Sequence, residues 1–421
     1  MTASEKAGRR PIALSATVIL VGTLGLAYIV SQFLRNSVGV IAPNLAAELN
    51  LSATQIGLLS STFFFAFAGA QIPLGLALDR YGPKICMVVC AGIAAFGAVF
   101  FAMATTPFGL IAARILMGVG SCCYFMAPLT LYARRYPPER FATFVGVQYS
   151  LGTLGTLFAT APLALSVAAI GWRTTFIVVA ACMIVAGALV ALVVREDDSP
   201  DAVQAETFRQ SVSGLMQALR APSVGPLFFM HVMTYSSFLL VVALWGGPYL
   251  THVYGYGLTA RGNVLFIAVV AQIAGSLVWG WADQWFGNYK QPVLLGTCLT
   301  ILALAVVAFF GVLPEAAVIL WFAAIGFFTA YVSVLIAHGK SLFPPPLVGR
   351  GLTLLNIGTM GGAFLTQTLT GFVIDLFPTR DGAYALDAYR LVFGLQAIFL
   401  LLACVGYLWA RDPRAQRPTS H

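Results

Sequence analysis

The stretch Gly75-Leu76-Ala77-Leu78-Asp79-Arg80-Tyr81-Gly82-Pro83-Lys84 decides the fold, because a degenerate copy of it returns later in the chain. Residues 280–290 read Gly-Trp-Ala-Asp-Gln-Trp-Phe-Gly-Asn-Tyr-Lys, which places Asp79 and Asp283 204 positions apart. A short segment of glycine and charge between two apolar runs predicts a tight turn between helices. Its return predicts a chain made of two related halves.

Other landmarks repeat at nearly the same offset. Pro43 is matched by Pro248, Gln148 by Asn356, Tyr136-Pro137-Pro138 by Phe343-Pro344-Pro345, and Trp172-Arg173 by Tyr389-Arg390. The prolines at 43 and 248 are predicted to close the first helix of each half, because proline cannot continue the backbone hydrogen bonding of a helix. Several landmarks in register strengthen the prediction of an internal repeat.

The composition is that of a membrane protein. Hydrophobic residues make up 59% of the 421 residues and charged residues only 9%, against roughly 25% charged in a soluble domain. Apolar stretches separated by glycine, proline and charge predict an all-α protein of twelve transmembrane helices in two pseudo-symmetric six-helix bundles. These helices are predicted to begin near residues 14, 54, 85, 107, 141, 173, 224, 260, 291, 315, 350 and 388.

The basic residues predict the orientation of the chain. The net charge is +8, but the Lys and Arg residues are scattered through short polar breaks, a distribution that argues against a nucleic-acid partner. Most of the 23 fall before the first predicted helix, after the last one, and in the turns that follow the second, fourth, sixth, eighth and tenth predicted helices. This distribution predicts a multi-pass protein of the inner membrane with both termini cytoplasmic. The basic start from Met1 to Arg10 precedes an apolar run without a small-residue cleavage site, so we expect an uncleaved first span.

One long polar break divides the chain. We expect a first six-helix bundle over residues 1–194, a cytoplasmic linker over 195–222 and a second six-helix bundle over 223–421. The linker contains apolar residues that share one helical face, which predicts an amphipathic helix on the membrane surface. These residues are Phe208, Val212, Leu215, Met216 and Leu219.

Three motifs resemble those of the major facilitator superfamily. The segment 75–84 resembles the signature that follows helix 2 in that family, with a proline where a basic residue is common. The pattern Leu110-x-x-x-Arg114-x-x-Met117-Gly118-x-Gly120 resembles the family's helix 4 motif, and Gly171-Trp172-Arg173 its start of helix 6. The resemblance implies a secondary transporter in which two six-helix halves alternately expose a central site.

The turn motif has a chemistry of its own. Glycines permit close helix approach and a tight turn, while Asp79 can accept hydrogen bonds from a facing helix or arginine. We therefore predict a cytoplasmic latch that controls the conformational change; the alternative is a solvated turn whose charges only set topology. The residues assigned to this gating role are Gly75, Asp79, Arg80, Gly82, Lys84, Arg114, Asp283 and Lys290.

Two arginines, Arg35 and Arg114, lie inside predicted spans, whereas the acidic residues fall in loops, termini and helix ends. Because charge is costly in hydrocarbon, this predicts a positive site that favours an anion. The segment Phe33-Leu34-Arg35-Asn36 resembles helix 1 of the organophosphate:phosphate antiporters, where an arginine binds the substrate's anionic group. The second arginine expected in helix 7 is missing, since Ser237 to Leu240 occupy that region. A monocarboxylate, a sulfonate or another organic anion remains open.

The remaining polar residues of the spans are candidates for substrate binding, although each could equally bond a neighbouring helix. Together with Arg35 they are Tyr124, Gln148, Tyr149, Tyr235, Trp245, Gln272, Tyr331 and Asn356. His231 and His338 are candidate proton carriers, because histidine titrates near physiological pH. The alternative for each histidine is a hydrogen-bonded packing role near a cytoplasmic helix end.

Metal and enzyme functions are weaker alternatives. The seven cysteines lie in apolar segments, where cysteine packs as a small hydrophobe. Met230, His231 and Met233, with Cys122, Cys123 and Met126, have ligand types that suit copper(I), but their spacing forms no fixed metal motif. No hydrolase or phosphate-binding motif appears in its required context, so we predict neither an enzyme nor a cofactor.

The sequence thus predicts a transporter that moves a small solute, chiefly an anion, by rocker-switch alternating access. Exchange against a second anion or a proton would drive it. We expect a monomer whose partners are the substrate and the lipid bilayer. The alternatives are a copper importer of the same fold, or a transporter-like membrane sensor that signals through the linker 195–222.

Overall fold

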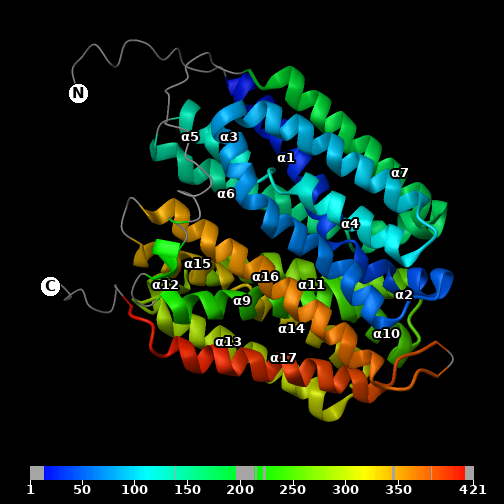
Figure 1. Ribbon diagram of the computed structural model, residues 1–421. Coiled ribbons are helices and arrows are strands. Elements are labelled where there is room, and N and C mark those ends of the chain that lie inside the picture. Colours follow the sequence, from blue (N-terminus) through cyan, green and yellow to red (C-terminus); the bar gives the residue numbers. More distant parts are fainter. Residues whose placement is uncertain are drawn as a thin grey trace, which may run out of the picture.

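The computed structural model describes residues 14–136, 138–195, 213, 216–220, 224–343, 347–380 and 382–412. Helices make up nearly all of this described part of the chain. Figure 1 shows the helices of the first half above those of the second half, with the long axes of both groups running across the view. The linker and its predicted amphipathic helix lie mostly outside the described residues.

The described residues of the first half form seven helices. Their bounds are α1 Leu14–Asn36, α2 Val38–Leu49, α3 Ala53–Met103, α4 Pro107–Ser121, α5 Met126–Arg135, α6 Pro138–Phe158 and α7 Ala161–Val193. The side chain of Ser52 accepts from the backbone of Gln55, and the side chain of Gln55 accepts from Ser52, which forms a capping box at the start of α3. Thr106 caps α4 in a similar way.

The second half begins with α9 Val224–Leu240, the π-helical segment η1 Val241–Trp245 and α10 Gly246–Tyr254. The helices that follow are α11 Leu258–Trp279, α12 Ala282–Trp285, α13 Lys290–Phe310, α14 Glu315–Thr329, α15 Val332–Leu342, α16 Val348–Asp375 and α17 Leu386–Tyr407. The described start of α1 and the end of α17 lie on the same side of the molecule, at the left of Figure 1.

Most of these bounds agree with the predicted helix starts, but α7 begins at Ala161 and runs past the start predicted near 173, after a kink at Gly171 with φ 77°. The number of candidate membrane spans also differs from twelve. Ten helices of the described chain are long and apolar enough to cross a membrane. Helix α3 is one of them, but its 51 residues include Gly82 at φ 78°, a left-handed conformation that turns the chain back. The spans predicted to begin near 54 and 85 are therefore its two arms. The span predicted near 141 is α6, which is not among the ten.

The predicted repeat appears in the geometry. Gly82 and Gly287 both have positive φ, at 78° and 67°. The repeated arginines also make equivalent bonds, since Arg173 donates to the carbonyl of Ala104 after α3 and Arg390 donates to that of Ala308 near the end of α13. The proline prediction was wrong: Pro43 lies inside α2 and Pro248 inside α10. The first span breaks earlier, at Ser37, between α1 and α2.

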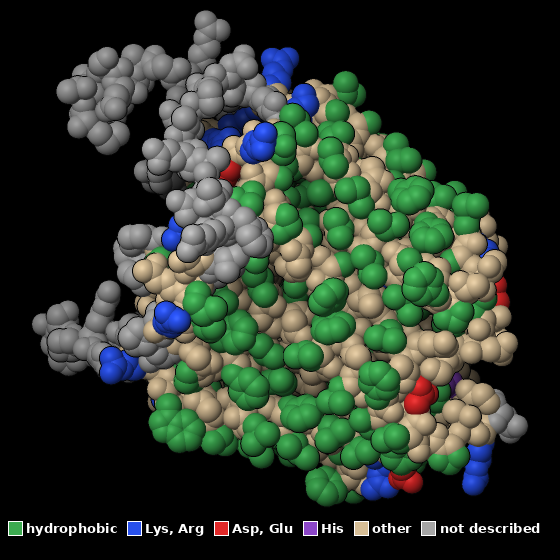
Figure 2. Space-filling view, viewed as in Figure 1, with side chains coloured by type: hydrophobic (Ala, Val, Ile, Leu, Met, Phe, Trp, Pro, Cys, Tyr) green, Lys and Arg blue, Asp and Glu red, His purple; other side chains and the backbone are tan. Residues whose placement is uncertain are grey.

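Surface chemistry matches a membrane-embedded chain. Figure 2 shows hydrophobic side chains spread over the broad middle of the molecule, while charged side chains gather toward its two ends. Many large apolar residues are exposed, among them Phe96, Leu192 and Phe309. In water such a surface would drive aggregation, whereas in a bilayer it faces lipid.

Candidate functional site

Arg35 is buried at the end of α1, where the two halves meet. Its side chain is 6% exposed, so it does not extend to the outer surface. The guanidinium carbon lies 4.4 Å from the centre of the Phe67 ring on α3, a cation–π contact that leaves the N–H groups free. The buried Nε has no hydrogen-bond partner. A buried guanidinium with unused N–H donors can bind an anion.

Aromatic residues of the first half lie near Arg35, and one residue of the second half lies near two of them. Tyr149 on α6 interacts electrostatically with Arg35, Tyr28 and Tyr235, and Tyr235 belongs to α9 of the second half. The ring of Phe125 links Tyr28 and Tyr149, at centroid distances of 5.6 and 6.5 Å. Tyr149 is nevertheless 46% exposed. We call Arg35, Tyr28, Phe67, Tyr149 and Tyr235 the Arg35 cluster.

Arg114 is fully buried, but it differs from Arg35 because backbone carbonyls use its donors. Nε donates to the carbonyl of Leu59 at 3.0 Å, and the terminal nitrogens donate to the carbonyls of Leu34 and Arg35. Its guanidinium also lies over the Phe63 ring. Arg114 thus ties α4 to α1 and α3 inside the first half and fixes the backbone that carries Arg35.

Four of the predicted substrate residues use their polar atoms on neighbouring helices. Tyr124 donates to the carbonyl of Met87 at 2.9 Å. Gln148 accepts from Tyr132 and donates to the carbonyls of Leu24 and Tyr124. In the second half, Trp245 donates to Thr370 at 2.9 Å and Tyr331 bonds Thr234 at 3.1 Å. The structure therefore places these four as ties within each half.

The other predicted residues lie in different surroundings. Gln272 on α11 and Asn356 on α16 are half-buried. In the region where a second arginine was expected, Ser236 and Ser237 are buried, and Gln396 of α17 donates to both of them. Helix α9, all of which the structure describes, therefore carries no Lys or Arg beside these serines.

The two histidines have unequal environments. His338 bonds the Tyr407 hydroxyl at 2.6 Å through Nδ1 and the carbonyl of Arg411 at 2.8 Å through Nε2. Its ring also stacks on Tyr289 at 5.6 Å. His338 thus ties the residues that follow α17 to α15. His231 is 2% exposed, and its Nε2 has no hydrogen-bond partner.

Sequence reasoning missed Gln367 on α16. This residue is fully buried, and neither its amide nitrogen nor its amide oxygen has a partner. An unpaired buried polar group costs about 1–3 kcal/mol, so a buried amide with two free atoms is a candidate ligand-binding group. Its backbone carbonyl packs on Gly57 of α3, where an added Cβ would lie 2.6 Å from it. The backbone of Gln367 therefore contacts the first half, and only the tertiary structure reveals this.

The predicted latch residues lie at the turn of α3. Gly82 needs its positive φ, whereas an added Cβ at Gly75 would meet nothing within 4 Å, so Gly75 does not mediate close helix packing. Asp79 and Arg80 are exposed and Lys84 is half-buried. In the second half, Asp283 lies on α12, and Lys290 donates to the carbonyl of Ala410 at 3.2 Å. The latch itself stays a prediction.

Bonds between the halves concentrate at the end of the molecule where α2 and α10 meet, which we call the outer junction (Figure 1). The Asp375 carboxylate at the end of α16 accepts from the backbone N–H groups of Ala53 and Thr54 at 2.9 and 2.8 Å. Arg261 of α11 donates to the carbonyl of Val40 and to the side chain of Asn44. An acid at a helix N-terminus and a buried arginine thus join the halves at this end.

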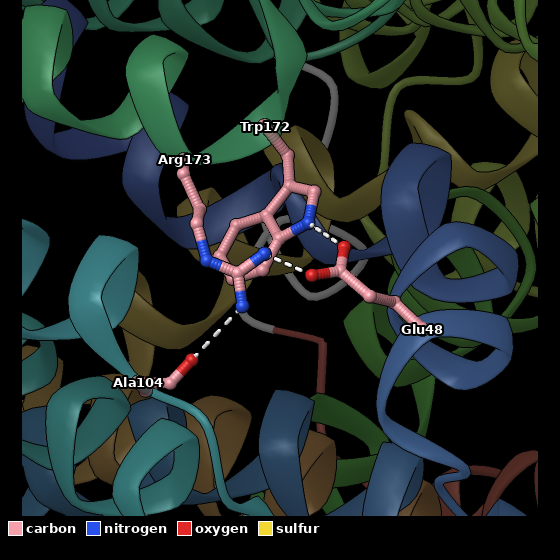
Figure 3. A network of polar contacts seen from close by, with 4 residues as sticks. All are labelled: Glu48, Ala104, Trp172 and Arg173. Atoms are coloured by element: carbon pink, nitrogen blue, oxygen red, sulfur yellow. Dashed lines mark hydrogen bonds and ion pairs between the residues drawn. The ribbon is translucent and has the colours of Figure 1, made fainter.

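A second polar network lies at the same end, within the first half (Figure 3). The Glu48 carboxylate accepts from the indole of Trp172 at 2.6 Å and from Arg173, and Arg173 also donates to the carbonyl of Ala104. Glu48 lies outside the ten candidate spans. The hydrogen bonds from Trp172 and Arg173 hold the pKa of Glu48 below its usual range. The network ties α2 to α7.

Several curated proteins are similar to this chain. A hexuronate transporter of Bacillus subtilis is 25% identical over 399 residues, which cover 89% of this chain and 92% of that protein. A probable sulfoacetate transporter of Cupriavidus necator is 27% identical, over 58% of each chain. A phosphoglycerate transporter protein of Salmonella typhimurium is 24% identical, over 86% of this chain and 84% of its own length.

Solved structures share the fold. A bacterial homologue of the human lysosomal transporter Spinster, inward-facing and unoccupied, superposes with a TM-score of 0.77 at 18% identity and covers 95% of this chain and 98% of its own. The nucleoside transporter NupG, as a D323A mutant, gives a TM-score of 0.76 at 16% identity, with 92% and 99% covered. The model of the Major Facilitator Superfamily matches residues 24–335 and 227–421. The chain belongs to the Major Facilitator Superfamily, whose members named here are transporters and not enzymes.

Proposed function

We propose that this protein is a secondary transporter of a small organic anion and that Arg35 binds the anionic group of the substrate. The observation that carries the proposal is a buried guanidinium whose Nε has no partner. Desolvation strengthens an ion pair between a guanidinium and a carboxylate, sulfonate or phosphate oxygen. The relatives named for hexuronate, sulfoacetate and phosphoglycerate support a substrate with such a group.

The cluster around Arg35 favours one anionic group at one end of the substrate. Arg35 is the cation that the first half contributes to this cluster, while the corresponding region of the second half contains serines bonded to Gln396. A substrate with charge at both ends would leave one charge without a partner, at a cost of several kcal/mol. Tyr149 and Tyr235 can bond the hydroxyl groups of the same molecule.

Gln367 is the residue that we assign to the second half of the site. Its free amide offers two donors and one acceptor, which suits an uncharged polar group such as a hydroxyl. A substrate held by Arg35 on α1 and Gln367 on α16 would touch both halves, as alternating access requires. Release of the substrate would also weaken the contact between the halves and permit their rotation.

Both termini are proposed to be cytoplasmic, as the basic residues predict. The outer junction, closed by Asp375 and Arg261, would then be the extracellular gate, and the cytoplasmic side would be the open one. Solute would enter or leave when these bonds break. A counter-anion or a proton would drive transport, and His231 is the candidate proton carrier whose Nε2 has no partner.

Reconstitution tests the proposal. The purified protein in liposomes should take up at least one of D-glucuronate, sulfoacetate and 3-phosphoglycerate, while glucose serves as the uncharged control. Each transported anion should raise the melting temperature, because a ligand of the native state stabilises it by mass action. Arg35→Gln should abolish both effects. If no anion is bound or transported by the wild-type protein, an anion transporter is the wrong assignment.

The same experiment separates the rival functions. A sensor would bind an anion without accumulating it. A copper importer gains no support from the relatives, and the described residues contain no group of three or more His, Cys, Asp or Glu that could hold a metal. The methionines of α9 and the cysteines after α4 also belong to separate packed clusters. Copper transport would appear as copper uptake that does not depend on Arg35.

A further inference from the structure

An apolar groove with a volume of about 450 Å³ lies between the two arms of α3 and the end of α4. The arms turn back on each other at Gly82, so the groove ends beside that turn. Its floor contains buried residues such as Leu74, Cys86 and Cys122, and its rim contains the exposed side chains of Tyr81, Ile85 and Val89. The groove is therefore open at the surface of the first half.

The lining determines what can fill the groove. All of the lining residues are apolar, aromatic or cysteine, and Cys86, Cys90 and Cys122 are buried and without disulfides. The volume falls within the range of about 300–1,000 Å³ that is typical of small-molecule sites. A polar solute would lose its hydration here without gaining hydrogen bonds. A hydrocarbon chain carries no polar group, so it fills the groove by van der Waals packing without that cost.

Two cations stand at the end of the groove nearest the turn. The guanidinium of Arg80 lies 5.3 Å from the ring of Tyr81, which is itself part of the rim, and Lys84 precedes Ile85 of the rim. Neither Arg80 nor Lys84 makes a hydrogen bond or an ion pair in the part of the chain that the structure describes. Asp79, the acidic residue of the same turn, has an interaction of its own. Two cations are thus available beside an apolar cleft.

We propose that this groove binds one acyl chain of an anionic phospholipid, whose phosphate is held by Arg80 and Lys84. Charge and shape select this occupant. Basic groups beside a cleft between transmembrane helices are a recognised form of anionic-lipid site at the cytoplasmic side. The groove lies within one half, apart from the Arg35 cluster, so the lipid neither competes with the transported solute nor depends on its identity.

The test measures lipid binding to the full-length protein. Nanodiscs of phosphatidylcholine, with and without phosphatidylglycerol, should show a higher melting temperature in the presence of phosphatidylglycerol. Native mass spectrometry should find that lipid retained. The double variant Arg80→Gln with Lys84→Gln should bind phosphatidylglycerol about 25-fold more weakly, because each basic group near an anionic headgroup contributes about a factor of five.

Matched controls separate this site from general membrane electrostatics. Lys340→Gln removes an exposed cation at the end of α15 and should leave lipid retention unchanged. Ala77→Phe should fill the groove and reduce retention with the cations intact, whereas Ala168→Phe, at an exposed position of α7, should not. Inorganic phosphate should give no stabilisation. Equal retention of phosphatidylglycerol by wild type, the double variant and Ala77→Phe, or equal losses in both controls, would overturn the proposal.

Discussion

Arg114 and Arg35 are adjacent buried arginines with opposite surroundings. Around Arg114, three carbonyls from α1 and α3 accept its donors. Around Arg35, the structure provides the face of Phe67 and leaves Nε unpaired. Both side chains lose their hydration on burial, but only Arg114 replaces the lost hydrogen bonds with hydrogen bonds to the protein. Burial of a charged side chain therefore does not by itself identify a binding site, whereas burial together with unused hydrogen-bond donors does.

The largest expected effect comes from substituting Arg114, whose donors bond backbone carbonyls. Arg114→Met should destabilise the protein by about 4 kcal/mol, because three buried carbonyls lose a charged donor and remain unpaired. The melting temperature in detergent measures the loss. Arg35→Met is the control, since it removes a guanidinium without leaving any hydrogen-bond acceptor unpaired, and it should melt no lower than wild type. If the two variants were equally unstable, the contrast between the arginines would be incorrect.

The next effect concerns the unsatisfied arginine. Arg35→Gln should weaken the binding of a transported anion by about a hundredfold, because charge-assisted hydrogen bonds to the substrate are lost. Arg35→Lys should keep the charge, lose the planar two-donor geometry and fall between wild type and Arg35→Gln. Isothermal titration measures these affinities. Unchanged affinity in both variants would remove Arg35 from the site.

Arg261 extends the comparison, because its bonds cross from one half to the other. Arg261→Gln should leave folding largely intact but shift the population toward an opened outer junction by about tenfold, as expected for the loss of one to two net hydrogen bonds. Spin labels on α2 and α10 measure this distance. Arg390→Gln, whose bonds stay within the second half, is the matched control and should leave the distance distribution unchanged.

The smallest effect belongs to the exposed pair of Glu48 and Arg173. Their side chains are about two-fifths exposed, so Glu48→Gln should cost only about 0.5 kcal/mol at neutral pH. Since the folded-state pKa of Glu48 is lowered, its contribution is present above the unfolded-state pKa of about 4.3 and is lost as the pH falls through the lower, folded-state value. Melting curves of wild type and variant should therefore converge in acid. A difference that grew in acid would contradict this sign.

Several features follow from the sequence alone, because they depend on local chemistry. Apolar length predicted the helices, and glycine and charge at 75–84 predicted the turn at Gly82. The repeat matched Arg173 with Arg390, and the structure gives these two residues equivalent bonds. The anionic character of the proposed substrate rests on Arg35, which the sequence also identified. These inferences hold because a bilayer leaves few alternatives to helices and makes each embedded charge conspicuous.

Only the tertiary structure decided how each buried polar group is used. The residue types of Tyr124, Gln148 and Gln367 do not separate a helix tie from a free ligand, because the same amide or hydroxyl serves either role. Partners supplied by distant segments make the difference: Gln148 has three, and Gln367 has none. The outer junction likewise needs Asp375 and Ala53, far apart in the chain, to meet. Hydrogen bonding is short-ranged and directional, so its pattern exists only once the helices are packed.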